Sequence, residues 1–372
     1  MKIIIQLFAA IVLASAARVA AQENVAPPPS PAESPPLSPE ASFFYDQLAP
    51  HGQWFWLEPY GWVWTPNDVD TAWRPYTDGH WVYTDCGWTW VSEREWGWAP
   101  FHYGRWFFHD HRGWCWVPGQ DWAPAWVSWR WGDNGCGWAP MPPLVAWETV
   151  SDWDTVIPTF AWCFVSPAHF HELHLREHLV LAAQNVTFLR TTRNVTRFEV
   201  RDRRLVNLSI TAEQLEKVIG RPVHRFKITD INSPNAARLS ISGRNEIHLY
   251  RPVVKETKVL SPIRREVIVN PARPAVTFDQ LRRDEAAHRQ FQAQQAQERQ
   301  ALERVHQSEL RTPPRGLSAQ ELRERQQAEH RAFNEHVNRQ NQIFENRRPA
   351  PPPPAPPAPS SRRSGRGTPN GR

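Results

Sequence analysis

A Trp-rich pattern recurs four times between residues 52 and 138 and limits the folds that this chain can adopt. The copies read GQWFWLEPYGWVW from Gly52, GHWVYTDCGWTW from Gly79, GRWFFHDHRGWCW from Gly104 and, in a decayed form, SWRWGDNGCGW from Ser128. A glycine before the second Trp pair recurs at 61, 87, 113 and 137, in steps of 26, 26 and 24 residues. Such a fixed spacing indicates one supersecondary unit stacked several times, with an atypical terminal copy.

Each copy predicts a β-hairpin. In the second copy, aromatic residues alternate with Val82 and Thr89 on either side of a four-residue loop, Thr84 to Gly87, while the first and third copies need five-residue loops. Period-two alternation around a short loop is typical of hairpins, and the glycine supplies a positive φ where a side chain would clash. We therefore expect one aromatic face in the first copy (Trp54, Trp56, Trp62 and Trp64) and one in the second (Trp81, Tyr83, Trp88 and Trp90).

The 21 Trp residues all lie between Trp54 and Trp162, and two explanations compete for them. Large aromatic rings are mostly buried, and cross-strand aromatic pairs stabilise hairpins by about 0.2 to 1 kcal/mol each, so a core role carries more weight. Aromatic hairpins are also platforms on which sugar rings stack, and the segments linking the copies add aromatic rings and carboxylates. The candidate binding residues are Trp73, Tyr76, Trp96, Trp98, His102, Tyr103, Trp122 and Trp126.

The N-terminal residues have the order typical of a cleavable secretory signal. Lys2 precedes an apolar run from Ile3 to Ala14, and small residues lead up to Ala21. The apolar run is shorter than the roughly 20 residues that a membrane-spanning helix needs. We expect cleavage after Ala21 and an exported mature protein without a transmembrane segment. The Pro, Ser and Glu content of residues 22–42 predicts an extended linker.

Four cysteines lie inside the Trp-rich region, at Cys86, Cys115, Cys136 and Cys163. An even number in an oxidising compartment permits two disulfides, with three connectivities that the sequence does not separate. Four buried small hydrophobic side chains are the alternative. No pair has the short spacing of a cysteine zinc site.

Charge is distributed unevenly along the chain. Residues 41–165 contain 14 acids, five Arg and no Lys, a net charge of −9, whereas residues 271–372 contain 18 Arg and 11 acids, a net of +7. A basic C-terminal arm is suited to an anionic surface, an acidic polymer, a protein partner or the protein's own acidic domain. Export argues against nucleic acid as the partner.

The region after about Ser166 reads as α+β. Thr211 and Gln214 form a capping box, and Gly220 ends the helix that they begin. Residues 197–200 and 225–229 alternate as strands, and residues 239–241 and 247–250 predict a hairpin.

Two further helices are expected in the C-terminal arm, where Thr277 with Gln280 and Ser318 with Glu321 form capping boxes, and Thr312-Pro313-Pro314 separates the helices. Their apolar residues are too sparse for a heptad seam, so we expect solvated helices rather than a coiled coil. A run rich in Pro and Arg, residues 349–372, predicts a disordered tail.

Catalytic and metal motifs are weak. In HFHELHLREH, residues 169–178, the metalloprotease spacing requires His at position 175, and Leu occupies it. His174 and His178 are four residues apart but lack further ligands in the motif. We found no phosphate-binding Gly loop, nucleophile elbow or marked carboxylate pair, and therefore assign no catalytic residue, metal or cofactor.

Two long runs resemble an exported bacterial family known as domain of unknown function 6600. They are WRPYTDGHWVYTDCGWTWVSEREWGWAPFHYGRW and GWCWVPGQDWAPAWVSWRWGDNGCGWAPMPP, and the likeness extends through NVTRFEVRDRRLVN and GRPVHRFKITD, over residues 43–255. The resemblance implies a bacterial envelope, periplasmic or secreted protein. It brings no established activity and no catalytic residues.

The sequence therefore predicts a mainly β protein with a Trp-rich repeated hairpin domain, a small α+β domain and an Arg-rich arm that is helical and then disordered. The expected segments are a signal (1–21), a linker (22–42), the hairpin domain (43–165), the α+β domain (166–262), the helical arm (263–348) and the tail (349–372). We expect a non-enzymatic envelope protein that binds peptidoglycan, another polysaccharide or another envelope polymer. The alternative is an assembly protein whose Trp residues are all core and whose arm recruits a partner; a polysaccharide-acting enzyme has least support.

Overall fold

The computed structural model describes residues 36–70, 72–150, 152–201, 204–234, 241–242, 245–255 and 278–347, which belong to one compact unit. The expected secretory signal, most of the linker and the Pro/Arg tail lie outside these residues. Among the described helices, none combines the length and apolar character needed to cross a lipid bilayer.

Helix α1 (Pro39–Leu48) begins inside the segment expected to be linker, so that prediction extends too far along the chain. Ser38 Oγ accepts a hydrogen bond from the Ala41 amide at 3.2 Å, and Pro39 occupies the first turn, where a missing N–H costs little. Burial of Phe44 and Leu48, which are both fully buried, stabilises the helix against the core. The Leu48 carbonyl also accepts from the Trp64 indole at 3.0 Å, which ties α1 to the first hairpin.

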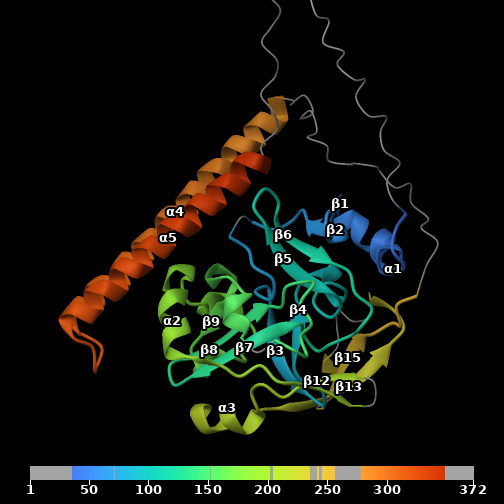
Figure 1. Cartoon of the computed structure of the whole chain (residues 1–372), viewed down its shortest axis with the longest axis horizontal. Helices are drawn as coiled ribbons and strands as arrows, with labels where there is room; N and C mark the ends of the chain where they lie inside the picture. Colours follow the sequence, from blue (N-terminus) through green and yellow to red (C-terminus); the bar gives the residue numbers. More distant parts are fainter. Residues whose placement is uncertain are drawn as a thin grey trace, which may run out of the picture. The chain divides into compact units, whose positions relative to one another are not determined.

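The four Trp-rich copies are antiparallel hairpins, as predicted (Figure 1). They consist of β1 (Gly52–Leu57) with β2 (Gly61–Pro66), β3 (Gly79–Thr84) with β4 (Gly87–Ser92), β5 (Arg105–His109) with β6 (Gly113–Val117), and β7 (Val127–Gly132) with β8 (Gly135–Pro140). The first and last residues of each predicted loop pair with each other as part of the strands. The loops are therefore shorter than predicted, with two or three unpaired residues each. Gly61, Gly87 and Gly113 have φ of 78°, 82° and 78°, which confirms their role in the turns.

The fourth copy differs from the prediction at Gly137. Its turn falls at Asp133 and Asn134, and Gly137 lies within β8, opposite Arg130, outside the left-handed region. A Cβ at Gly137 would lie 2.3 Å from the Phe164 ring. This glycine therefore allows the close approach of β9 (Cys163–Val165) rather than forming a turn.

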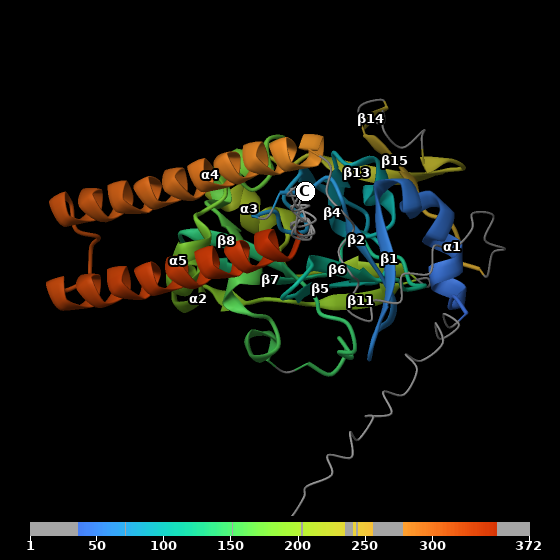
Figure 2. The same ribbon diagram turned by 90° about the horizontal axis from the view of Figure 1, so that it is seen from above.

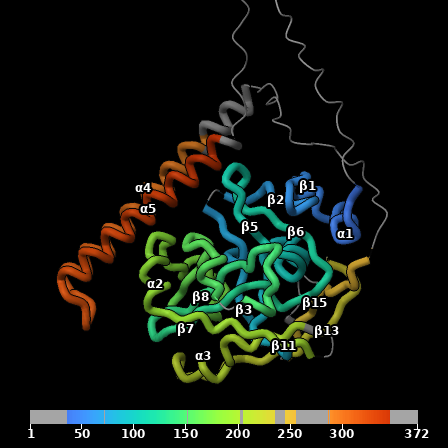
Figure 3. The backbone as a smooth tube through the Cα atoms, viewed as in Figure 1, coloured from blue at the N-terminus to red at the C-terminus, as the bar shows by residue number. Residues whose placement is uncertain are grey.

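Strands beyond residue 166 join two of the three sheets that the hairpins form. The sheet orders are β1-β2-β6-β5, β10-β7-β8-β9 and β14-β15-β13-β3-β4. Strand β13 (Arg225–Ile231) pairs in parallel with β3, and also with β15 (Glu246–Tyr250), which lies beside it in Figure 3. The remaining strands are β10 (Arg193–Asn194), β14 (Ile241–Ser242) and the separate ribbon of β11 (Phe198–Arg201) and β12 (Arg204–Asn207). The two regions thus share sheets, although their compositions differ.

Short helices join these strands. Helix α3 (Ala212–Ile219) has the predicted Thr211–Gln214 capping box and ends at Gly220, whose φ is 70°. The others are α2 (Asn185–Thr191) and the 3-10 turns η1 (Ala49–His51), η2 (Glu95–Trp98), η3 (Trp153–Thr155), η4 (Thr159–Ala161), η5 (Pro167–His169), η6 (Leu175–His178) and η7 (Ala182–Gln184).

The Trp residues form the core of the molecule. Sixteen of the 21 are buried, and the other five, Trp56, Trp98, Trp122, Trp131 and Trp147, are half-buried. Cross-strand Trp54–Trp64, Trp81–Trp90 and Trp129–Trp138 pairs place the rings of each hairpin on one face, as predicted. Several indole N–H groups donate to carbonyls far along the chain, which satisfies their hydrogen-bonding needs within the core.

The arm forms two long antiparallel helices, α4 (Phe278–Arg311) and α5 (Ala319–Arg347) (Figure 2). The Ser318–Glu321 capping box is present. The expectation of solvated helices is wrong for their inner faces, because Phe333 and Glu329 are buried and α5 contacts η7 and α2. The interface between α4 and α5 contains both apolar and polar pairs. The Phe291 and Phe344 rings stack at 5.1 Å, and His306 Nε2 lies 2.7 Å from a Glu329 oxygen.

Candidate functional site

Most of the predicted binding residues belong to the core. Six of the eight are at most 4% exposed: Trp73, Tyr76, Trp96, His102, Tyr103 and Trp126. Only Trp98 and Trp122 are half-buried. An aromatic hairpin face has the same sequence pattern whether it binds a ligand or packs inside, so the sequence does not separate the two roles.

The structure nevertheless brings the linking segments together around Tyr76. Its hydroxyl donates to the Phe101 carbonyl at 3.1 Å and accepts from the Trp126 amide at 3.2 Å. The Trp126 indole in turn donates to the His102 carbonyl at 3.1 Å. Burial raises the pKa of Tyr76 and lowers the pKa of His102 to about 4, so both are neutral at physiological pH. These residues act as a structural hub.

A cleft of about 640 Å³ opens beside this hub, and we call it the aromatic cleft. Its aromatic lining is formed by Tyr103, Trp122, Trp126 and Trp147. Its charged lining is formed by Asp121, Glu148, Asp230 and Arg251, and its apolar lining includes Val200 and Val253. The cleft therefore joins three of the predicted residues to others that the sequence did not single out.

Separate parts of the chain position these side chains. Trp122 lies in the link between β6 and β7, and its ring is parallel to His102 at 5.4 Å. The Arg251 guanidinium lies 4.8 Å from the same ring and pairs with Asp230 on β13. The Tyr103 hydroxyl donates to the Pro252 carbonyl at 2.7 Å, which holds the segment after β15 against the cleft.

Charge at the aromatic cleft is predominantly negative. Three exposed carboxylates face one guanidinium, and that guanidinium already pairs with Asp230. Behind the lining, Arg105 stacks on Trp126 with its guanidinium 3.4 Å from the ring centre. Burial lowers the pKa of Arg105 to about 10, so it stays charged at neutral pH and forms a cation–π contact.

Trp147, Glu148, Val200 and Arg251 were not identified from the sequence as site residues. Trp147 and Glu148 follow the last copy of the repeat, and the other two lie more than fifty residues further on. The position of Trp147 outside the repeats was no signal, because Trp153 and Trp162 also lie outside them and are buried.

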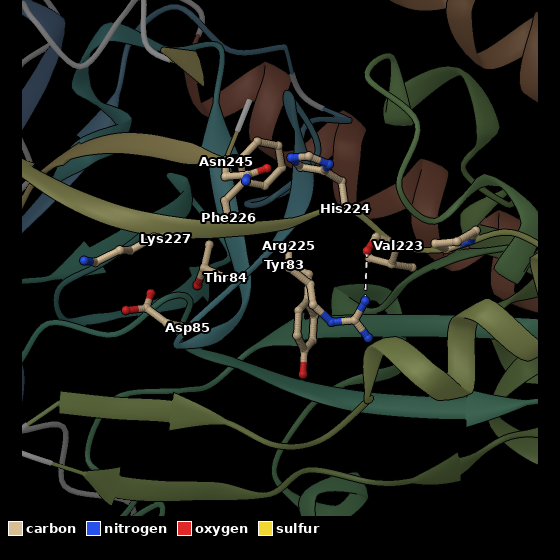
Figure 4. A pocket seen from close by; sticks show the side chains of 10 residues that line it. Tyr83, Thr84, Asp85, Val223, His224, Arg225, Phe226, Lys227 and Asn245 are labelled. Atoms are coloured by element: carbon tan, nitrogen blue, oxygen red, sulfur yellow. Dashed lines mark hydrogen bonds between the residues drawn. The ribbon is translucent and has the colours of Figure 1, made fainter. Parts of the chain in front are cut away.

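A second hollow lies where β13 meets β3 (Figure 4). Tyr83 and Arg225 lie side by side there, and Arg225 pairs with Glu213 and Glu216 at 2.8 Å. Asp85 accepts from the Ile228 amide at 3.4 Å. Because Arg225 and Asp85 are already engaged within the chain, this hollow lies at a structural contact between the two regions.

Trp98 lines a smaller pocket of about 170 Å³, together with His102 and Tyr250. The Trp98 and Tyr250 rings meet edge to face at 4.8 Å. The predicted binding residues that are not part of the aromatic cleft or this pocket are Tyr76, which packs in the hub, and Trp73 and Trp96, which pack with Trp106.

The histidine motif does not form a metal centre. His169 and His178 stack in parallel at 4.1 Å, while His171 Nε2 lies 2.7 Å from the Arg221 guanidinium. Across the described part of the chain, no three His, Cys, Asp or Glu side chains are grouped to hold a metal ion.

The structure describes the four cysteines as buried thiols, with no disulfide between them. Cys86 and Cys115 pack in two separate small clusters, and only Cys136 and Cys163 share the main core. Those two lie on adjacent strands but are offset by two residues, since Cys136 faces Val165 and Cys163 faces Trp138. Burial raises the pKa of both thiols.

The fold and the cleft define a mainly β protein with a Trp core, a solvent-facing aromatic cleft and a C-terminal helical pair. Residues 45–145 match a family of unknown function, DUF6600, which confirms the resemblance seen in the Trp-rich runs. The match does not include the residues from 146 to 255 over which the likeness was expected to continue. No curated protein and no solved structure matches the chain.

Proposed function

We propose that the protein is a non-enzymatic, exported envelope protein that binds a glycan in the aromatic cleft. One observation carries the proposal: two of the five half-buried Trp residues, Trp122 and Trp147, line the same cleft as the exposed carboxylates of Asp121 and Glu148. Binding sites are typically concave and aromatic, with a few polar groups that fix the orientation of the ligand.

A sugar ring suits this lining because it has an apolar C–H face and a rim of hydroxyl groups. The face packs on an indole, and the hydroxyl groups donate to carboxylate oxygens such as those of Asp121 and Glu148. The negative lining favours neutral or amino-bearing sugars over polymers of uronic acids, since like charges brought together are costly. Peptidoglycan and neutral envelope polysaccharides are therefore the ligands that we expect.

Binding without catalysis is the interpretation that the carboxylates support. A glycosidase needs one carboxyl group in an apolar setting that keeps it protonated, facing a second across the scissile bond. Asp121 and Glu148 are both exposed, and Asp230 is paired with Arg251. The cleft thus offers hydrogen-bond acceptors rather than a general acid.

Co-sedimentation of the full mature chain with insoluble peptidoglycan and neutral polysaccharides, in low and high salt, tests the proposal. We expect salt-resistant binding that Trp147→Ala weakens at least about tenfold, as for a residue at the centre of a binding site. Trp56→Ala is the matched control, because Trp56 is equally half-buried but lies on the first hairpin. If both variants bind like the wild type, or no polymer is retained, the proposal is wrong.

The burial of sixteen Trp residues supports a second candidate, an assembly protein in which the arm recruits a partner. The outer faces of α4 and α5 carry many exposed charged side chains, including Arg323, Glu324 and Arg331. Retention of a polymer or partner only at low salt, with equal loss in variants of these helices and none in Trp147→Ala, would favour this role.

A further inference from the structure

The aromatic cleft has an apolar rim that a glycan does not need. Val200 and Val253 are 62% and 75% exposed, although both line the cleft. They come from β11 and from the segment after β15, and they face the same opening as Trp147. Exposed apolar side chains gathered at one cleft, next to half-buried indoles, mark a surface for a peptide or protein segment.

The cleft also has a charge that selects among peptides. Its lining contains Asp121, Glu148 and Asp230 against Arg251 alone. Because Arg251 already pairs with Asp230, the acceptors left for a ligand are the exposed carboxylates of Asp121 and Glu148, which also interact electrostatically with the half-buried Arg105. A peptide that places cationic side chains beside apolar ones matches this lining.

Such a peptide is present in the chain itself. Residues 349–359 read PAPPPPAPPAP, and the following residues include Arg362, Arg363, Arg366 and Arg372. No acidic residue occurs after Glu345. Proline-rich runs favour the extended polyproline II conformation, which grooves lined by aromatic rings bind at little entropic cost, with flanking Arg residues paired to acids.

The length of the tail allows it to reach the cleft. Near the end of α5, the Arg339 guanidinium lies 4.0 Å from the Phe160 ring, so the helix ends close to the surface of the β region. The 25 residues that follow Arg347 span about 78 Å in the polyproline II conformation. That length exceeds the diameter of about 45 Å expected for a compact region of this size.

We propose that the aromatic cleft binds the chain's own C-terminal tail, residues 349–372, with prolines against Trp122 and Trp147 and arginines beside Asp121 and Glu148. The tail then covers the cleft until a stronger ligand displaces it. This inference uses the cleft of the proposed function but does not depend on a glycan being its other ligand.

The chain supplies a matched control peptide. Residues 26–40, APPPSPAESPPLSPE, are also rich in proline but contain Glu33 and Glu40 and neither Lys nor Arg. If proline alone governed binding, this segment would bind as well as the tail. The charge of the cleft instead predicts that it binds at least about tenfold more weakly.

The test is fluorescence anisotropy with labelled peptides of residues 349–372 and 26–40. Each is titrated with the full mature chain and with a full chain whose tail arginines are changed (Arg362→Ser, Arg363→Ser, Arg366→Ser), which frees the cleft. We expect the tail peptide to bind the changed chain at least about tenfold more tightly than the wild type, because the native tail competes at a high effective concentration.

Variants of the cleft are made on the changed chain. Trp147→Ala, Val253→Asp and Glu148→Gln should each weaken binding of the tail peptide several-fold, while Trp56→Ala should not. Val253 and Glu148 are exposed, so these two substitutions test the cleft without depending on a core position. Glu148→Gln should also reduce the salt dependence of binding.

Failure of the tail peptide to bind the changed chain overturns the inference. Equal affinity of the two peptides for the changed chain also overturns it. So does a result in which the three cleft variants bind the tail peptide as tightly as the Trp56→Ala control. Co-sedimentation of the changed chain with polysaccharide is measured in parallel. Peptide binding without polysaccharide binding leaves the inference standing and removes the proposed glycan function, and the reverse result removes the inference alone.

Discussion

The Asp78 carboxylate accepts a hydrogen bond from the Arg176 guanidinium at 2.7 Å, although 98 residues separate them. Asp78 is only 7% exposed and also receives two hydrogen bonds from Arg94, at 2.9 and 2.6 Å. The two arginines extend to Asp68 and Asp70 on the surface. This network ties the start of the second hairpin to the segment around η6, in which the histidine motif lies.

Replacing Asp78 with Asn should therefore destabilise the fold by about 3 kcal/mol, because two guanidinium groups lose a buried anionic partner. Asp68→Asn is the control, since Asp68 is 53% exposed and its pair with Arg94 should contribute no more than about 1 kcal/mol. Urea unfolding at neutral pH measures both values. Equal losses would show that the network acts as an ordinary surface pair.

Two turn glycines offer a matched test of close packing. Gly61 and Gly87 have nearly the same φ, but a Cβ at Gly87 would lie 2.0 Å from the Asn207 carbonyl oxygen, whereas at Gly61 the nearest atom is 3.6 Å away. Gly61→Ala should lower the free energy of unfolding by about 1 to 2 kcal/mol, because alanine is strained in the left-handed conformation. Gly87→Ala should lower the free energy of unfolding by about 1 to 3 kcal/mol more, because the new Cβ would push the Asn207 carbonyl, and with it β12, away from the turn.

Thermal unfolding of the two glycine variants, measured in the same buffer, gives this difference directly. A smaller loss for Gly87→Ala than for Gly61→Ala would mean that the contact between the second hairpin and Asn207 is loose.

The features that could be predicted from the sequence are those set by local physics. Alternating Trp residues around a glycine specify a hairpin and its aromatic face, and Thr211 with Gln214 specifies a helix start, because the interacting groups lie within a few residues of each other. Gly137 was misread because the decayed copy moves its turn to Asp133 and Asn134.

The features that could not be predicted depend on contacts between distant residues. The parallel pairing of Arg225 with Tyr83 joins strands about 140 residues apart, and no local pattern encodes it. The aromatic cleft likewise needs Trp147, Val200 and Arg251 from three segments. Burial decides which Trp can meet a ligand, and burial of a ring is set by the strands that cover it rather than by its own hairpin.

The four buried cysteines predict a chemical result. Cys86, Cys115, Cys136 and Cys163 should resist alkylation by iodoacetamide in the native state, because they are buried and the thiolate is the reactive form. Unfolding in guanidinium without a reductant should expose four reactive thiols. Mass spectrometry counts the labels. Labelling that appears only after reduction would instead show that the protein contains disulfides.

His102 should make the fold sensitive to acid. Burial holds its pKa at about 4 in the folded protein, while an unfolded histidine titrates near 6.5. The unfolded state therefore takes up a proton first as the pH falls, so stability is lost between about pH 6.5 and pH 4 and no further below that. The shift corresponds to a loss on the order of 3 kcal/mol over this window.

Urea unfolding of wild type, His102→Gln and His111→Gln at pH 7 and pH 4.5 measures this contribution. His102→Gln should lower stability at pH 7, because the Nδ1 contact to the Ala123 carbonyl is lost, but should lose less on acidification than the wild type. His111 is exposed in a hairpin loop, so His111→Gln should follow the wild-type curve. Other histidines whose pKa is lowered by desolvation, including His336 with a pKa of about 3, are the same in all three proteins, so the difference between the curves isolates His102. Parallel wild-type and His102→Gln curves would place the acid sensitivity elsewhere in the core.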